Sequence, residues 1–125
     1  MKLVDTSSWV EYLRDRESEI GDSIEVLVLS GEAAWCDITL VELWHGVRGA
    51  KEKRQLAEME NEIERIPVDA TVWRLASKLA LCCREKGTNV PISDIITAAC
   101  AVTHGLELEH CDKHFNDILP LAKSL

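Results

Sequence analysis

Short apolar runs alternate with longer amphipathic stretches along the chain. Within the longer stretches, apolar residues recur every three or four positions, as at Ile20, Ile24 and Leu27, and this spacing predicts helices. The short runs, such as "KLVD" and "EAAWCDI", are typical of buried strands. Strands are expected at 2–5 and 32–38, with a weaker one at 106–110. Helices are expected at 7–14, 18–31, 39–49, 51–66, 69–87 and 93–105.

Three segments are harder to assign from the pattern. Residues 66–68 read as a short strand or an extended link, 112–118 as a turn or short helix, and 119–125 as an edge strand. The alternation of strands and helices predicts an α/β fold, a doubly wound α/β/α sandwich with a mostly parallel central sheet. In such sheets the ligand crevice lies beyond the carboxyl ends of the strands.

The length of the chain and its cysteine content limit the class of protein. A chain of 125 residues is expected to form one domain, residues 1–125, with a substantial core. Its five cysteines are odd in number and lie mostly in apolar runs, which favours a reducing compartment over a disulfide framework. No apolar run approaches the about 20 residues needed to cross a bilayer, and Asp5 interrupts any signal-like start. We therefore expect a cytoplasmic protein without a membrane partner.

The net charge is strongly negative. Lys and Arg total 14 against 22 Asp and Glu, a formal charge of −8. Taken alone, this balance argues against a nucleic-acid-binding protein, whose electrostatic footprint is usually basic. Carboxylates gathered in one cleft, however, are how proteins hold hard cations, so the position of the acids matters more than their sum.

Four acidic residues fall at the carboxyl end of an expected strand or at the helix start just after it. Asp5 ends the first strand, Glu42 lies early in the helix after the second, Asp94 opens the helix at 93–105, and Asp112 follows the strand at 106–110. A parallel sheet would bring all four to one edge. Carboxylates so grouped repel one another unless a cation is bound. Oxygen ligands favour Mg²⁺ or Mn²⁺, which could support phosphodiester hydrolysis.

Each acid also has a purely structural interpretation. Glu42 completes a capping box with Thr39, and Asp94 follows Ser93, the expected N-cap of its helix, where the helix dipole favours an acid. Asp112 could be a turn former. Asp5 has the weakest structural interpretation, because Ser8 and Glu11 already form a capping box for the first helix.

Four blocks of sequence carry a resemblance to a known family. The blocks "LVDTSSWVEYL", "TLVELWHG", "PISDIITAACAV" and "CDKHFNDI" occur in this order and span nearly the whole chain. In this respect the sequence resembles PIN-domain proteins, and specifically the VapC toxins of prokaryotic toxin–antitoxin pairs. The resemblance implies an endoribonuclease that depends on Mg²⁺ or Mn²⁺ and has RNA as its substrate. It also implies two protein partners, a cognate antitoxin that silences the enzyme and a second copy in a homodimer.

The same resemblance assigns roles to individual residues. It implies that Asp5, Glu42, Asp94 and Asp112 are catalytic and bind the metal, with Ser7 as a supporting hydroxyl beside Asp5. The chain departs from many relatives at His110, where a Thr or Ser is common, and at His114, where some carry another acid. Asp117 is a weaker candidate for a supporting role.

Other functions compete with this interpretation. His110, Cys111 and His114 could bind zinc, although no second Cys/His pair lies elsewhere at zinc spacing. A phosphatase with an aspartate nucleophile would need D-x-D, and Ser7 stands at the second position. A catalytically inactive PIN-fold module that acts through partner or RNA binding is the remaining alternative; the presence of all four acids favours the enzyme.

The densest basic segment is "RGAKEKR". Such a cluster is often only a solvated helix face, but it could also bind RNA phosphates beside the acids. The residues expected to bind RNA are Arg48, Lys51, Lys53 and Arg54.

Overall fold

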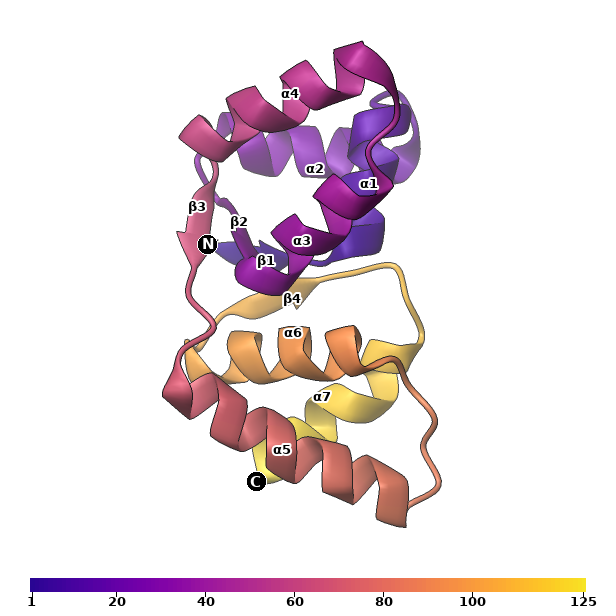
Figure 1. Cartoon of the computed structure of the whole chain (residues 1–125), viewed down its shortest axis with the longest axis vertical. Helices are drawn as coiled ribbons and strands as arrows, with labels where there is room; N and C mark the ends of the chain where they lie inside the picture. The colour runs from indigo at the N-terminus through magenta and orange to yellow at the C-terminus, as the bar shows by residue number, and fades with distance from the viewer.

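The computed structural model describes all 125 residues and has a four-stranded sheet at its centre (Figure 1). The strands lie in the order β3-β2-β1-β4, and every neighbouring pair is parallel. Leu3 is in register with Ala34 on one side and with Leu108 on the other. The bounds are β1 Lys2–Val4, β2 Ala33–Cys36, β3 Glu64–Ile66 and β4 Glu107–Glu109.

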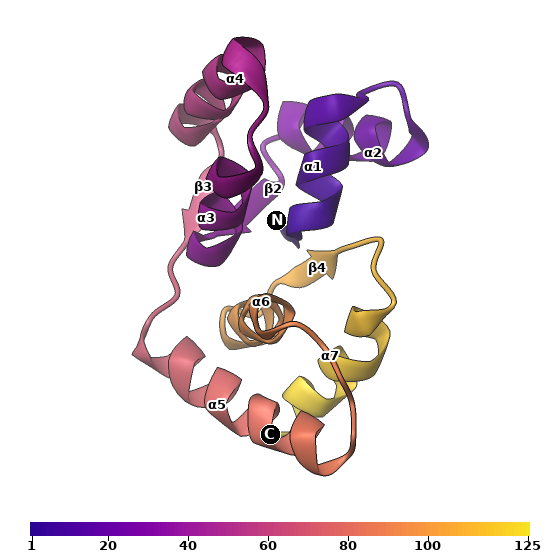
Figure 2. The same cartoon turned by 45° about the vertical axis from the view of Figure 1, so that its right-hand side comes forward.

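Helices cover both faces of this sheet (Figures 1 and 2), which confirms the expected α/β/α sandwich. On one face lie α1 Thr6–Arg14, α2 Glu19–Leu29, α3 Asp37–Gly46 and α4 Gly49–Glu62. On the other lie α5 Ala70–Glu85, α6 Ile92–Thr103 and α7 His114–Ser124. Because all four strands are parallel, their carboxyl ends and the helix starts that follow them share one edge of the sheet.

The two helical layers pack on the sheet with different side chains. Under α1 and α2 the core is aromatic: Trp9 contacts Trp35 and Tyr12 at ring-centroid distances of 5.2 and 5.7 Å. To the other core α6 contributes mostly small residues, and Ala98 and Ala99 are fully buried. Small side chains let α6 lie close to the sheet, and Thr97 of α6 contacts Cys36 at the end of β2.

The end of the chain corrects one expectation. Residues 119–125 are not an edge strand; 119–124 belong to α7, whose buried positions Phe115, Ile118 and Ala122 lie on one helical face. The alternating leucines at 119 and 121 suggested a strand, but packing of this face against α6 decides the structure.

The expected helix at 51–66 is also too long. α4 ends at Glu62, and Glu64–Ile66 instead forms β3, the edge strand that pairs with β2. Arg65 in β3 forms an ion pair with Asp37, just after β2, and this contact between distant segments is invisible to local periodicity. The sequence pattern allows a short strand at 66–68, and the observed strand begins two residues earlier, at Glu64.

Two smaller expectations can be compared with the structure. All five cysteines are free. None of the helices combines the length and the apolar character that crossing a membrane requires.

Candidate metal centre

Asp5 follows β1 directly and is 2% exposed. Its Oδ1 accepts a hydrogen bond from the Ser8 N–H at 3.1 Å, and its Oδ2 accepts one from the Ser7 hydroxyl at 2.9 Å. Asp5 is therefore the N-cap of α1, and the expected capping box of Ser8 and Glu11 is wrong, because the helix already begins at Thr6. The two hydrogen bonds fix the carboxylate at the carboxyl end of the strand.

Glu42 lies in α3 and faces the start of α1. The Thr6 hydroxyl donates a hydrogen bond to its Oε1 at 2.7 Å, so the residue next to Asp5 holds the second acid. The expected capping box of Thr39 with Glu42 is wrong, because α3 begins at Asp37 and Thr39 is buried inside the helix. Thr6 was missed as a functional residue; its only signal in the sequence is its position beside Asp5.

Asp94, Asp112 and His114 form a tight group. His114 Nδ1 lies 3.1 Å from Asp94 Oδ2 and 3.2 Å from Asp112 Oδ1. The His114 backbone N–H also donates to Asp112 Oδ1 at 3.0 Å. One ligand-type atom from each residue lies within 4.8 Å of the others, a spacing at which one ion could be held.

The local structure around these residues differs from expectation in one respect. The N-cap of α6 is Pro91 rather than Ser93, and no side chain caps this helix, so Asp94 lies in its uncapped first turn. Asp112 lies in the link between β4 and α7, and His114 opens α7. His114, named in the sequence analysis as a departure from relatives and as part of the zinc alternative, is thus part of the group. We call Asp5, Glu42, Asp94, Asp112 and His114 the acidic cluster.

Asp94 lies in the electric field of two other acids of the cluster. Burial raises the pKa of the Asp94 carboxyl above its usual value, and the negative charges of Asp112 and Glu42 raise it further, while His114 opposes the shift. Three different elements therefore contribute charge to one site. This is the arrangement expected where the carboxyl ends of parallel strands meet.

The cluster fits a divalent cation on the chemistry of its donors. No Lys or Arg forms an ion pair with any of its four acids, and His114 is the only basic side chain that pairs with them. Asp5 is a buried carboxylate that is held by hydrogen bonds from Ser7 and Ser8 and not by a basic side chain. Carboxylate oxygens suit Mg²⁺ or Mn²⁺, and an imidazole is also compatible with first-row transition metals.

Other candidate residues lie outside this cluster. His110 packs on Phe115, with 5.0 Å between ring centroids, and neither it nor Cys111 joins a group of metal ligands with His114, so the zinc alternative is not supported. Ser7 is in place as a donor to Asp5. Arg48 begins the basic segment, in which Arg48 and Lys51 line a groove that Lys53 and Arg54 do not reach.

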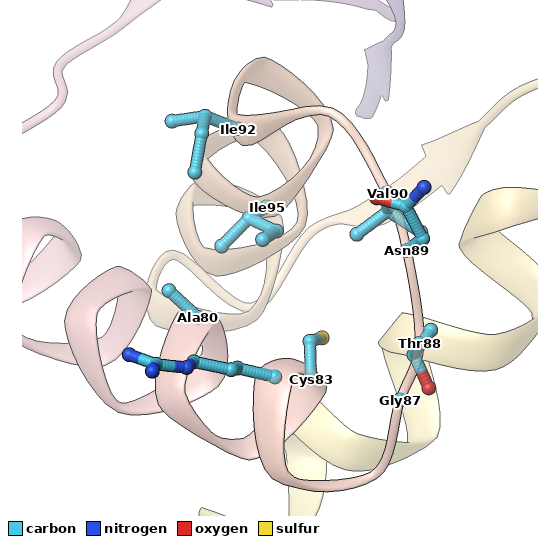
Figure 3. A pocket seen from close by; sticks show the side chains of 9 residues that line it. Ala80, Cys83, Gly87, Thr88, Asn89, Val90, Ile92 and Ile95 are labelled. Atoms are coloured by element: carbon cyan, nitrogen blue, oxygen red, sulfur yellow. The ribbon is translucent and has the colours of Figure 1, made fainter.

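A separate cavity of about 330 Å³ lies between α5, the link after it and the start of α6 (Figure 3). Its wall includes Cys83 and Ile95, and no acid of the cluster lines it. The cavity is therefore distinct from the acidic cluster, although Ile92 and Ile95 flank Asp94 in sequence.

Comparison with known proteins shows the family of the chain. The sequence profile of the PIN domain matches residues 2–118. Ribonuclease VapC11 of Mycobacterium tuberculosis is 32% identical over 123 residues, which cover 94% of this chain and 91% of that protein. The chain therefore belongs to the PIN-domain family, in its VapC group.

Solved structures show the same fold. VapBC2 from Rickettsia felis, bound to a DNA fragment from its promoter, matches with a TM-score of 0.77 and 21% identity, over 94% of this chain and 92% of that one. A toxin–antitoxin complex from Klebsiella pneumoniae matches with a TM-score of 0.72 and 21% identity, over the same shares.

Proposed function

We propose that the chain, as one nuclease domain of residues 1–125, is an endoribonuclease that hydrolyses RNA phosphodiester bonds with Mg²⁺ or Mn²⁺. The observation that carries the proposal is the group of Asp94, Asp112 and His114, whose ligand-type atoms lie within 4.8 Å of one another. Glu42 adds its negative charge to Asp94, and no Lys or Arg forms an ion pair with these acids or with Asp5. Membership of the VapC group, whose relative VapC11 is named a ribonuclease, supports the choice of RNA.

The side chains of the cluster would have separate tasks. When bound, Mg²⁺ or Mn²⁺ supplies a Lewis acid that polarises the phosphodiester. Asp5, Asp94, Asp112 and Glu42 would hold it. Ser7 and the Ser8 N–H keep the Asp5 carboxylate in position, and Thr6 does the same for Glu42. His114 holds the side chains of Asp94 and Asp112 near each other.

The proposed function includes protein partners and a location. A cognate antitoxin and a second copy of the chain are the partners; the matched structures of toxin–antitoxin complexes support the first. Exposed apolar side chains, among them Val41 and Ile92, offer surface for such contacts. The five free cysteines support a cytoplasmic location.

Cleavage of RNA by purified protein, free of antitoxin, tests the proposal. Total cellular RNA is incubated with protein in Mg²⁺, in Mn²⁺ and in EDTA, beside Asp94→Asn. Asp22→Asn, an exposed acid on α2, is the control for a lost charge. We expect discrete fragments that need metal, persist in the control and vanish in Asp94→Asn.

Two further measurements make a negative result meaningful. Circular dichroism shows that Asp94→Asn is folded, and calorimetric titration with Mn²⁺ measures binding without RNA. Folded wild-type protein that neither cleaves RNA nor binds Mn²⁺ would refute the proposal. Metal-independent cleavage retained by Asp94→Asn would also refute it.

A further inference from the structure

A basic groove lies at the opposite end of α1 from Asp5. It has a volume of about 460 Å³ and is lined by Leu13, Arg14, Arg48, Lys51, Glu52 and Gln55, which we call the basic groove. In Figure 1 the start of α4 lies at the upper right, beside the end of α1. Residues 34 positions apart in the sequence, Arg14 and Arg48, therefore face one groove.

The basic side chains of the groove form no ion pairs within the protein, and they outnumber its one acid. Among the Lys and Arg side chains, ion pairs involve Lys2, Arg16 and Arg65, and none involves Arg14, Arg48 or Lys51. The lining also holds one acid, Glu52, whose Oε1 accepts a hydrogen bond from the Arg48 backbone N–H at 3.2 Å, so three basic side chains face one carboxylate. Three unpaired cations thus meet in a protein whose net charge is −8.

The start of α4 adds to this positive potential. No side chain accepts a hydrogen bond as an N-cap there, so the first N–H groups of the helix remain available. The helix dipole places partial positive charge at the same end. The backbone therefore reinforces the charge of the three side chains.

The lining of the basic groove favours a phosphate backbone over a polypeptide. Leu13 is its only hydrophobic residue, whereas peptide-binding grooves depend on apolar pockets for anchoring side chains. Guanidinium groups match phosphate oxygens in pairs, and Lys adds a mobile charge. An anion with regularly repeated charge and little apolar surface is the ligand that this groove fits.

The distance between the basic groove and the acidic cluster determines how far from the cleaved bond such a ligand would be contacted. Asp5 caps the start of α1 and Arg14 lies in its last turn, so the two are separated by about 13 Å along the helix at 1.5 Å per residue. This span corresponds to a few nucleotides of an extended strand. A single RNA could therefore contact both ends of α1.

We propose that the basic groove binds backbone phosphates of RNA a few nucleotides from the bond that is cut. This inference rests on the proposed function, since it places a second contact on the same substrate. Arg14, Arg48 and Lys51 are the binding residues, and Lys53 and Arg54 are not part of the groove.

Binding of a fluorescent single-stranded RNA in EDTA, measured by anisotropy over a range of salt concentrations, tests the proposal without cleavage. The double variant Arg14→Gln/Lys51→Gln removes two groove charges. Lys78→Gln/Lys86→Gln, two exposed lysines at another pocket near the end of α5, makes the same change in net charge. We expect the groove variant to bind more weakly and its salt slope to fall by about 1.4, at about 0.7 per phosphate contact. The control keeps the wild-type slope.

Three outcomes would overturn the proposal. If the salt dependence of RNA binding is unchanged in the groove variant, the two side chains make no phosphate contacts. If the salt slope falls equally in the groove variant and in the control, RNA responds to the overall charge of the protein and not to the basic groove. Binding of poly-glutamate that depends on the groove, together with RNA binding that does not, would assign the groove to an acidic protein partner. Because the assay contains no metal, loss of cleavage with an intact groove effect would contradict only the proposed function.

Discussion

The two ends of α1 carry opposite charge, and the protein holds those charges in different ways. At the first end, Asp5 is buried and accepts two hydrogen bonds, and Thr6 fixes Glu42. At the second end, Arg14 is exposed and has no ion-pair partner. The acids come from two helices and two links, and hydrogen bonds within the protein hold them, whereas the basic side chains have no such partners.

This difference matches two kinds of work. Chemistry at a metal requires ligands held in a productive geometry by surrounding hydrogen bonds. Binding a flexible phosphate backbone requires positive charges close to the phosphates, and the long side chains of Arg and Lys provide them. One helix thus connects a preorganised site to an adaptable one.

The largest expected effect comes from breaking the acidic end at Asp5, which has two roles. Asp5→Asn keeps a good N-cap but loses the charge, so we expect unchanged stability and RNA cleavage lowered by at least about a hundredfold. Asp5→Ala should lose activity equally and also lower the free energy of unfolding by about 1 kcal/mol. Cleavage rates and urea unfolding of the two variants measure this. Full activity in Asp5→Asn would show that Asp5 acts only as the N-cap of α1 and not in cleavage.

A smaller effect should follow from removing the hydrogen bond by which Thr6 holds Glu42 at the acidic end of α1. Thr6→Val removes the hydroxyl that donates to Glu42 and keeps the shape of the side chain. Because Glu42, a proposed metal ligand, loses its hydrogen-bond donor, Mn²⁺ affinity should fall by about 10-fold or more. Calorimetric titration measures this, with Thr6→Ser, which retains the hydroxyl, as the control. Equal Mn²⁺ affinity in Thr6→Val and wild type would show that the acidic end needs no such support.

The smallest effect concerns the middle of α1, which joins the two ends. Tyr12, the single tyrosine, is 3% exposed, and burial beside Glu25 raises its pKa from 10.0 to about 12. The unfolded chain therefore loses this proton first, so stability should be unaffected below pH 10 and should fall as pH rises from 10 to 12. Phenolate absorbance, with chain unfolded in guanidinium as the reference, reports the titration. A native tyrosine that titrates near its ordinary value would show that α1 is not packed as described.

The sequence predicted the acidic end far better than the basic end. Asp5, Glu42 and Asp112 were identifiable because each follows an expected strand, and parallel strands share one carboxyl edge. Asp94 was identifiable from its place at the start of an expected helix. That Asp5 also caps α1 was missed, because Ser8 and Glu11 imitate a capping box. Whether all four acids bind metal stays a prediction.

The features that escaped prediction depend on contacts between distant segments. Arg14 joins Arg48 only because α4 docks beside the end of α1. β3 forms because the edge of β2 is open to Glu64–Ile66, and α7 because Phe115 and Ile118 pack on α6. Local periodicity carries no information about such pairings.

The most direct measurement is cleavage of one RNA under single-turnover conditions over a range of protein concentrations, in Mn²⁺ or Mg²⁺. Wild type, Asp94→Asn and Arg14→Gln/Lys51→Gln are compared. The account predicts that Asp94→Asn loses the saturating rate, while the groove variant keeps that rate and needs more protein to reach half of it. Saturating cleavage by folded Asp94→Asn at the wild-type rate would contradict the claim that the acidic end of α1 performs the chemistry.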